Sequence, residues 1–322
     1  MNQPLLSICI PTYNRYTKLK PMLEQLLLCP RNDFEVVIQD NCSTDDTKNL
    51  KNDFKDERIK LLKNPVNIGG IINGYEALYT ASGKYCMICL DKDTVKGDCL
   101  SDFLDYLSEN SSINYGICEL NKEIENSVYC KNNNQIYTDY EKSFSFFAYR
   151  SRHPSGMFWK TELLRKTDIV PKILSSHVVF GFFTELIYAE IASQNANGCF
   201  YKNSLIVTET SEESARKKTL TYDISQIFFL PKNRIREFKV YLGQLSKLKV
   251  KNKIKIWCKV FYRGLKTTTF GFKVIMQDKE HLYHYGLEPK KIEIMKLIKI
   301  SFNYCFSILF TSSKKTFDSL FI

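Results

Sequence analysis

The chain has 322 residues with a formal net charge of +11, and 44% of them are hydrophobic, which is enough for a large domain with an appended region. Its eleven cysteines lie mostly in apolar segments, which is typical of small core residues in a reducing compartment and argues against a disulfide scaffold. No apolar stretch has the length that a membrane span requires. Residues 297–310 come closest, but that stretch is short and contains Lys299. Met1 to Pro4 lead straight into an apolar run, so no signal peptide is expected.

Strand and helix patterns alternate through the first hundred residues. An apolar run over residues 5–10 predicts a buried strand, which ends at Pro11 because proline lacks the N–H that a ladder bond needs. Such alternation is typical of a parallel sheet covered by helices. The further elements predicted in chain order are a helix over 19–27, strands over 34–39 and 59–62, a helix over 71–81 and a strand over 85–90.

The predicted strand over 85–90 ends in two carboxylates one residue apart, Asp91 and Asp93. The carboxyl ends of parallel strands meet at one crevice, where α/β proteins bind ligands. Carboxylate oxygens suit Mg²⁺ and Mn²⁺, and such sites often include substrate phosphates. An isolated Asp-x-Asp is also common in solvated turns, so the neighbouring polar clusters decide the interpretation. They favour a metal that bridges the protein to a diphosphate.

Four segments, in this order, resemble an inverting family 2 glycosyltransferase with the GT-A fold. They are residues 8–15 (ICIPTYNR), 37–47 (VIQDNCSTDDT), 67–70 (NIGG) and 90–93 (LDKD). The resemblance is strong over residues 5–100 and weaker to about 210. It implies an α/β GT-A catalytic domain over 1–215, a mostly parallel sheet flanked by helices, and a helical, basic region over 216–322.

The resemblance also implies a role for each matching residue of the donor site. Asp40 would accept a hydrogen bond from the base, since a carboxylate can only accept. Asp93 would bind the Mn²⁺ or Mg²⁺ that neutralises the diphosphate, and Thr94 stands where the family often has a further Asp. The residues expected to bind the nucleotide sugar are Pro11, Thr12, Tyr13, Arg15, Asp40, Asn67, Gly69, Asp91 and Lys92.

Inverting transfer needs a carboxylate base that removes a proton from the acceptor hydroxyl. In the family this base lies on a downstream helix, often in a Glu-Asp pair. The corresponding stretch is residues 184–190 (TELIYAE), in which Leu186 replaces the Asp. Glu185 is therefore the predicted base, with Glu190 in reserve. The alternative is that Glu185 only complements the dipole at the start of a helix.

Residues 153–160 (HPSGMFWK) resemble the turn and strand that precede the acceptor site in such enzymes. His153 is a candidate for contact with a phosphate or sugar, or else a turn histidine without such a role. Gly156 is expected to allow a close backbone approach to donor or acceptor. Trp159 could stack on an acceptor sugar or belong to the core.

The charge of the chain is concentrated in its last part. From Lys232 onward there are 20 Lys and Arg against 6 Asp and Glu, a net charge of +14, which leaves −3 for residues 1–231. Residues 247–263 alternate cations with apolar and aromatic side chains, which predicts a basic amphipathic helix on an anionic membrane surface. The alternative is a helical subdomain with a solvated basic face that packs against a second copy in a homo-oligomer.

These observations favour a cytoplasmic, metal-dependent inverting glycosyltransferase, peripheral at the inner face of the plasma membrane. It would move one sugar from a nucleotide sugar, with UDP favoured, to a cell-surface glycan or a polyprenyl-diphosphate-linked acceptor. One alternative is an inactive scaffold of the same fold, which the missing Asp after Glu185 leaves open. Binding of nucleic acid through the basic tail is disfavoured, because no recognisable motif occurs and the charge lies outside the crevice-forming part. A nucleotidyltransferase is disfavoured because such enzymes usually have a glycine-rich basic loop after the first strand. Residues 11–15, which follow the first predicted strand, contain no glycine.

Overall fold

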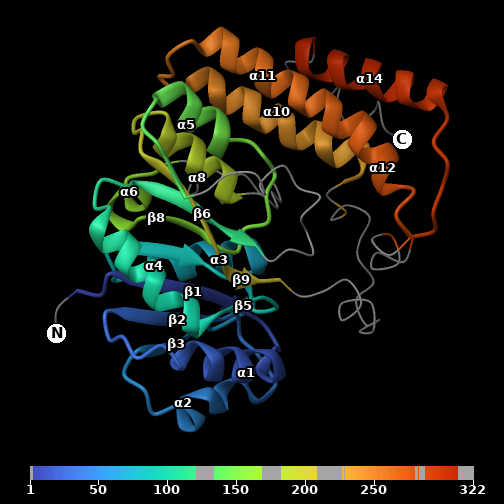
Figure 1. The fold of residues 1–322 in the computed structure, drawn as a ribbon. Helices are drawn as coiled ribbons and strands as arrows, with labels where there is room; N and C mark the ends of the chain where they lie inside the picture. The colour runs from blue at the N-terminus through green and yellow to red at the C-terminus, as the bar shows by residue number, and fades with distance from the viewer. Residues whose placement is uncertain are drawn as a thin grey trace. The chain divides into compact units, whose positions relative to one another are not determined.

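The computed structural model divides the chain into two compact units, Met1–Glu209 and Thr210–Ile322 (Figure 1). The domain boundary predicted at residue 215 falls within residues 209–226, outside the described part of the chain. The residues that the structure describes are 3–120, 134–168, 183–208, 227, 229–279, 282 and 287–310.

The first unit is an α/β fold built on one sheet. Each predicted strand and helix of the first hundred residues is present within a few residues of its expected bounds. The elements are β1 (Leu6–Thr12), α1 (Tyr16–Leu27), β2 (Phe34–Asp40), the 3₁₀ helix η1 (Asp46–Asn49), α2 (Leu50–Asp53), β3 (Ile59–Lys63), α3 (Gly70–Tyr79), β4 (Tyr85–Ile88), β5 (Thr94–Val95), α4 (Gly97–Glu109), β6 (Tyr115–Leu120), β7 (Gln135–Tyr137), α5 (Tyr140–Phe147), β8 (Met157–Lys160), α6 (Thr161–Arg165), α8 (Phe183–Ala192) and β9 (Gly198–Val207).

The sheet runs in the order β3-β2-β1-β4-β8-β6-β9-β5, with β7 paired to β9. The β3-β2-β1-β4 part is parallel, whereas β8 pairs antiparallel with both β4 and β6. From β1 the chain builds outward through β2 and β3, then crosses to the other side of β1 to form β4. This reversal of strand order between β1 and β4 creates the crevice in which α/β folds bind ligands.

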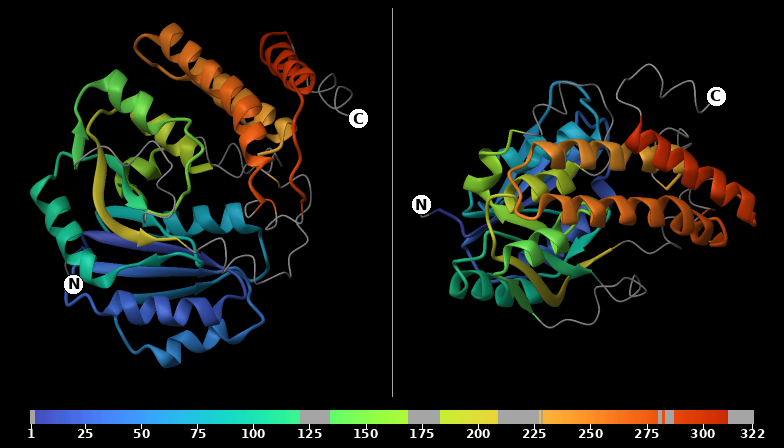
Figure 2. Two further views of the ribbon diagram at one scale, coloured as in Figure 1. Left: turned by 45° about the vertical axis from the view of Figure 1, so that its right-hand side comes forward. Right: turned by 90° about the horizontal axis from the view of Figure 1, so that it is seen from above.

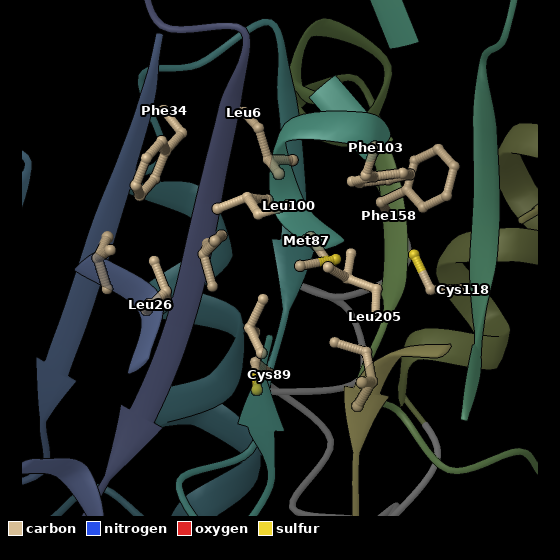
Figure 3. Packing of buried hydrophobic residues seen from close by; sticks show 14 of the residues in the cluster. Leu6, Leu26, Phe34, Met87, Cys89, Leu100, Phe103, Cys118, Phe158 and Leu205 are labelled. Carbon is tan, nitrogen blue, oxygen red and sulfur yellow. The ribbon is translucent and has the colours of Figure 1, made fainter. Parts of the chain in front are cut away.

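The core of this unit lies between the sheet and helices α1 and α4. Successive residues of a strand face opposite sides, so Leu6, Ile8 and Ile10 share one face of β1, and all three are fully buried. Figure 3 shows Leu6 and Phe34 of the sheet in the same cluster as Leu26 of α1 and Leu100 and Phe103 of α4. Burial of such a side chain stabilises the fold by about 1.5–3 kcal/mol. This packing fixes the strands whose carboxyl ends carry the polar loops.

The second unit is helical in its described residues. Helices α10 and α11 pack side by side (Figure 2), and α14 contacts both of them. Its elements are α10 (Pro231–Lys247), α11 (Lys253–Lys266), the π-helical turn η4 (Thr267–Gly271), α12 (Phe272–Ile275) and α14 (Ile294–Leu309). No helix among the described residues has both the length and the apolar character to cross a membrane.

The helix predicted over residues 247–263 is wrong at its start. Helix α10 ends at Lys247, and α11 begins only at Lys253. Between them the backbone of Asn252 adopts a left-handed conformation with φ of 53°, which reverses the chain. Trp257 of α11 is half-buried and stacks on Phe261 of the same helix.

Candidate active site

The loops after β1 and β4 are joined at the crevice by a hydrogen bond between side chains. Thr12, the last residue of β1, donates its hydroxyl proton to Oδ2 of Asp91 over 3.0 Å. Burial raises the pKa of Asp91, and this rise is opposed by the positive charge of Arg15 and by the bond from Thr12. The structure therefore brings together Thr12, Arg15 and Asp91, three of the residues predicted to bind the donor.

Asp93 is held from the opposite direction by the segment before β8. Its side chain is fully buried, and its Oδ2 atom accepts a 2.5 Å hydrogen bond from Oγ of Ser155. The same Oγ atom accepts the backbone N–H of Leu90, which fixes the turn that carries both carboxylates. His153 Nε2 lies 3.4 Å from Oδ2 of Asp93, and burial lowers the pKa of this histidine. Sequence reasoning missed Ser155, although it lies in the segment that resembles the family.

Buried amide side chains form a network beneath the carboxyl ends of β1, β2 and β3. Asn64 donates to Oδ1 of Asn41 and Oδ1 of Asn73, and Asn41 donates to Oδ1 of Asn67 over 2.8 Å. Asn73 donates to the carbonyl oxygens of Gln39 and Thr12, which ties α3 to both strands. The network positions the predicted donor residue Asn67, whose Oδ1 also accepts the N–H of Gly69. Asn41, Asn64 and Asn73 were missed, although a polar Asn on an apolar face of the predicted helix over 71–81 is a usable signal.

Asp40 and Gly69, two further donor-site candidates, lie at the end of β2 and directly before α3. Asp40 ends β2 opposite Thr12 of β1, is buried, and accepts the N–H of Ser43 over 2.9 Å. The backbone of Gly69 has a φ of 85°, a conformation that residues other than glycine rarely adopt. Among the other residues predicted to bind the donor, Pro11 and Lys92 are half-buried. Tyr13, directly after the carboxyl end of β1, exposes 44% of its surface.

Asn14 fastens the loop after β1 to the loop after β2. Its Oδ1 atom accepts the backbone N–H groups of Thr44 and Asp45, and its own N–H donates to Oγ of Ser43. Its backbone is left-handed, with φ of 53°, which asparagine tolerates better than most residues. Two of the loops predicted to surround the nucleotide are thus held as one piece.

Glu185 holds the loop that leads to His153 and Ser155. It lies near the start of α8 and is fully buried, and its two carboxylate oxygens accept the backbone N–H groups of Arg150 and Arg152, each over 2.8 Å. Tyr149 and Ser151 in this loop have left-handed φ values of 58° and 55°, a conformation that costs on the order of 1 kcal/mol each. The two hydrogen bonds offset that cost. The role of Glu185 as the base stays a prediction.

The three remaining candidates of this region differ in their surroundings. Gly156 has a φ of 83°, and a Cβ atom there would lie only 3.0 Å from Cγ1 of Ile206, so the turn requires glycine. Trp159 is fully buried and packs on Tyr188 with ring centroids 4.9 Å apart. Its indole lies in the core, so direct stacking on an acceptor sugar is not supported. Glu190, the reserve base, accepts the N–H of Asp168.

The carboxylate oxygens at the turn after β4 are ligands that suit a hard divalent cation, and such a cation can bind a substrate phosphate at the same time. Asp91 and Asp93 present oxygen donors at one turn, and Mg²⁺ typically binds one or two carboxylates together with substrate phosphates and water. Among the described residues, no group of three or more His, Cys, Asp or Glu could hold a metal by itself. A cation at this turn would need further ligands from water and substrate phosphates.

The strand order, the polar loops at the switch point and the Asp-x-Asp turn define a GT-A nucleotide-sugar-binding fold. Solved structures with this fold include residues 1–349 of TarS from S. aureus in complex with UDP-GlcNAc, with a TM-score of 0.56 and 14% identity over 93% of this chain and 89% of that one. A mannosyltransferase from Pyrobaculum calidifontis, in complex with GDP-Man and Mn²⁺, has a TM-score of 0.54 and 16% identity over 85% of this chain and 75% of that one. At these identities the likeness shows the fold.

Residues 7–166 match the model of glycosyl transferase family 2, and through them the chain belongs to that family. Abequosyltransferase RfbV of Salmonella typhimurium is 35% identical over 118 residues, 34% of each chain. The GalNAc(5)-diNAcBac-PP-undecaprenol beta-1,3-glucosyltransferase of Campylobacter jejuni is 31% identical over 123 residues, 37% of this chain and 40% of that protein. The matches thus span between a third and half of these curated relatives. The predictions of family and fold are confirmed.

Proposed function

We propose that this protein is a metal-dependent, inverting glycosyltransferase that moves a single sugar from a nucleotide sugar to a hydroxyl group of its acceptor. The main support is the turn at Asp91 and Asp93, which lies at the switch point of the sheet and is bonded to Thr12 on one side and Ser155 on the other. Carboxylates fixed in this way could hold a divalent cation against a diphosphate without a large rearrangement.

The donor is proposed to lie across the carboxyl ends of β1, β2 and β4. Asp40 would accept a hydrogen bond from the base, with UDP favoured as the nucleotide. Asn67 and Gly69 would lie beside the nucleoside, and Arg15 and Lys92 would face the phosphates. Mn²⁺ or Mg²⁺ held by Asp93, with Asp91 beside it, would neutralise the negative charge that develops on the leaving diphosphate.

Glu185 is proposed as the group that takes the proton from the acceptor hydroxyl. Its place supports a role near the reacting atoms, because the loop that it binds leads directly to His153 and to Ser155, the partner of Asp93. The present contacts of its two oxygens mean that proton transfer requires a shift of residues 150–152. His153 is proposed to contact a phosphate or the transferred sugar.

The acceptor is proposed to be a surface glycan or an oligosaccharide linked to a polyprenyl diphosphate. Support comes from the Campylobacter jejuni relative, whose name states an undecaprenol-linked acceptor. The net charge of +14 from Lys232 onward supports a peripheral location at an anionic inner membrane face.

The test is donor binding and hydrolysis over a panel of UDP-, GDP-, dTDP- and CDP-sugars, with and without Mn²⁺. The proteins compared are the wild type, Asp93→Asn and the matched surface variant Asp98→Asn. We expect one donor to be selected with Mn²⁺ present, and Asp93→Asn to lose this binding while Asp98→Asn keeps it. A folded wild type that binds no donor would contradict the proposal and favour an inactive scaffold.

A further inference from the structure

The second unit contains a groove of about 690 Å³ between the start of α10, α12 and α14. Its size is within the range of small-molecule sites. The walls are apolar, with Ile235 from α10, Phe272 from α12, and Met295 and Ile300 from α14. Phe272 and Ile300 also belong to the buried cluster of this unit, so the floor of the groove is the core itself.

The rim of the groove is cationic. Lys232 lies in the first turn of α10, and Lys296 and Lys299 lie one turn apart on α14. No Asp or Glu is among the described residues that line the groove. The groove also meets the N-terminal end of the 17-residue helix α10, where the helix dipole is positive. The site therefore suits a molecule that joins an anionic head to an apolar chain.

The apolar surface of the groove continues onto the solvent-exposed outer face of α14. This outer face consists of large apolar side chains that are exposed: Ile294, Met295, Ile298, Phe302, Phe306, Leu309 and Phe310. The side of α14 opposite to them buries Leu297, Ile300 and Tyr304. Met295 is 71% exposed and also lines the groove, so the two surfaces are continuous. A contiguous exposed apolar patch of this kind marks an interaction site rather than ordinary surface.

Charge and length decide what covers this face. Helices α11, α12 and α14 contain no Asp or Glu, whereas they carry eight Lys and Arg. A bilayer with anionic headgroups complements such a surface, whereas a second copy of the same cationic surface would be repelled. Helix α14 has 16 residues and is about 24 Å long, too short for a bilayer core of about 30 Å but suited to lie in its interface.

We propose that the groove binds one anionic membrane lipid, with its phosphate at the lysine rim and an acyl chain along the apolar walls, while the outer face of α14 lies among the acyl chains of the same leaflet. Lys296 and Lys299 then meet the phosphate, and Phe302 and Phe306 enter the apolar layer. The inference deepens the proposed function by placing the membrane contact on α14, whereas the sequence suggested residues 247–263.

The experiment is co-sedimentation of the full chain with vesicles of phosphatidylcholine alone or with added phosphatidylglycerol. Wild type is expected to bind the anionic vesicles at least about tenfold more tightly than the neutral ones. Lys296→Glu with Lys299→Glu should lose at least about tenfold of that binding. The matched pair Lys48→Glu with Lys51→Glu, exposed in the first unit, changes the net charge equally and should bind like wild type.

Substitutions on the outer face separate lipid insertion from association between copies. Phe302→Ser with Phe306→Ser should lower vesicle binding at least about tenfold and leave the protein folded, since both side chains are exposed. Equal binding by the α14 lysine variant and wild type, or an equal loss in the Lys48 and Lys51 control, would overturn the proposal. It would also be overturned by a solution dimer that the Phe302 and Phe306 variant disperses, combined with no vesicle binding.

Donor binding, measured on the same proteins, keeps the two proposals separate. The α14 variants should bind the nucleotide sugar like wild type, because they change only the second unit. If the wild type binds the nucleotide sugar but not the anionic vesicles, the lipid site alone is refuted. If the wild type binds the anionic vesicles but no nucleotide sugar, the proposed function alone is refuted.

Discussion

The hydroxyl of Ser155 lies 2.5 Å from Oδ2 of Asp93, and it also accepts the N–H of Leu90. One small side chain thus joins the turn after β4 to the segment that precedes β8, which lie 62 residues apart in the chain. It fixes the orientation of the carboxylate that we propose to bind the metal. Partners of this kind set how well a carboxylate is placed for its ligand.

Ser155→Ala should lower metal-dependent donor binding about 10–100-fold, because Asp93 then loses the group that orients it. Calorimetric titration of the protein with the nucleotide sugar at a fixed Mn²⁺ concentration measures the change in donor affinity. Ser108→Ala is the control, since that serine is exposed and bonds only within α4. Donor affinity equal to wild type in Ser155→Ala would show that Asp93 is oriented without it.

Glu185→Gln should lower both the stability and the rate of transfer. The amide NH₂ of Gln would face one of the two backbone N–H groups, at Arg150 or Arg152, that the carboxylate now accepts. Leaving such a buried donor unpaired costs about 1–3 kcal/mol. Thermal and urea unfolding measure this cost, and single-turnover transfer at saturating donor measures the chemistry.

The two readouts of Glu185→Gln test different statements. Unchanged stability would contradict the contacts with the loop. A full rate of transfer would contradict the assignment of Glu185 as the base. Glu162→Gln is a suitable control, because that glutamate is exposed in the first turn of α6.

Asn73→Ala should destabilise the first unit by about 1–3 kcal/mol, because it leaves Asn64 and the carbonyl oxygen of Gln39 without their buried partner. Urea unfolding measures the change, with the exposed Asn52→Ala as the control. Donor affinity should fall as well, since Asn64 and Asn41 then lose the support that places Asn67. A variant as stable as wild type would show that the amide network adds nothing to the fold.

Glu35 should make the stability of the first unit depend on pH in acid. Burial raises the pKa of Glu35, but bonds from Lys60, Ser7 and Ser82 outweigh it, so the pKa lies below the ordinary value of 4.5. A lowered pKa means that the ionised form stabilises the fold above the pKa of the unfolded chain, and that this contribution is lost as the pH falls below it.

The measurement is Tm against pH for wild type and Glu35→Gln. The variant should be less stable near neutral pH, and the difference should shrink as the pH falls below 4.5. Parallel curves over the whole range would mean that Glu35 does not titrate with folding.

The sequence predicted which polar residues gather at the strand ends because these signals are local. Buried strands are apolar runs, and the polar residues lie at or just beyond their ends, as Thr12 ends β1 and Asp91 comes shortly after β4. Once the strands are parallel, these residues must meet at one edge of the sheet. The role of Trp159 was ambiguous in the sequence because no local signal decides it: an indole suits both a core and a sugar-binding surface.

The sequence by itself determined the α/β class, the family resemblance, the residues at the strand ends and the cationic character of the last part of the chain. Only the tertiary structure decided which side chains support them, because Ser155, Asn73 and Glu185 act over separations that no local pattern encodes. It also decided which helix of the second unit exposes an apolar face. Amphipathic periodicity shows that a helix has two faces, but packing against its neighbours decides which one α14 buries.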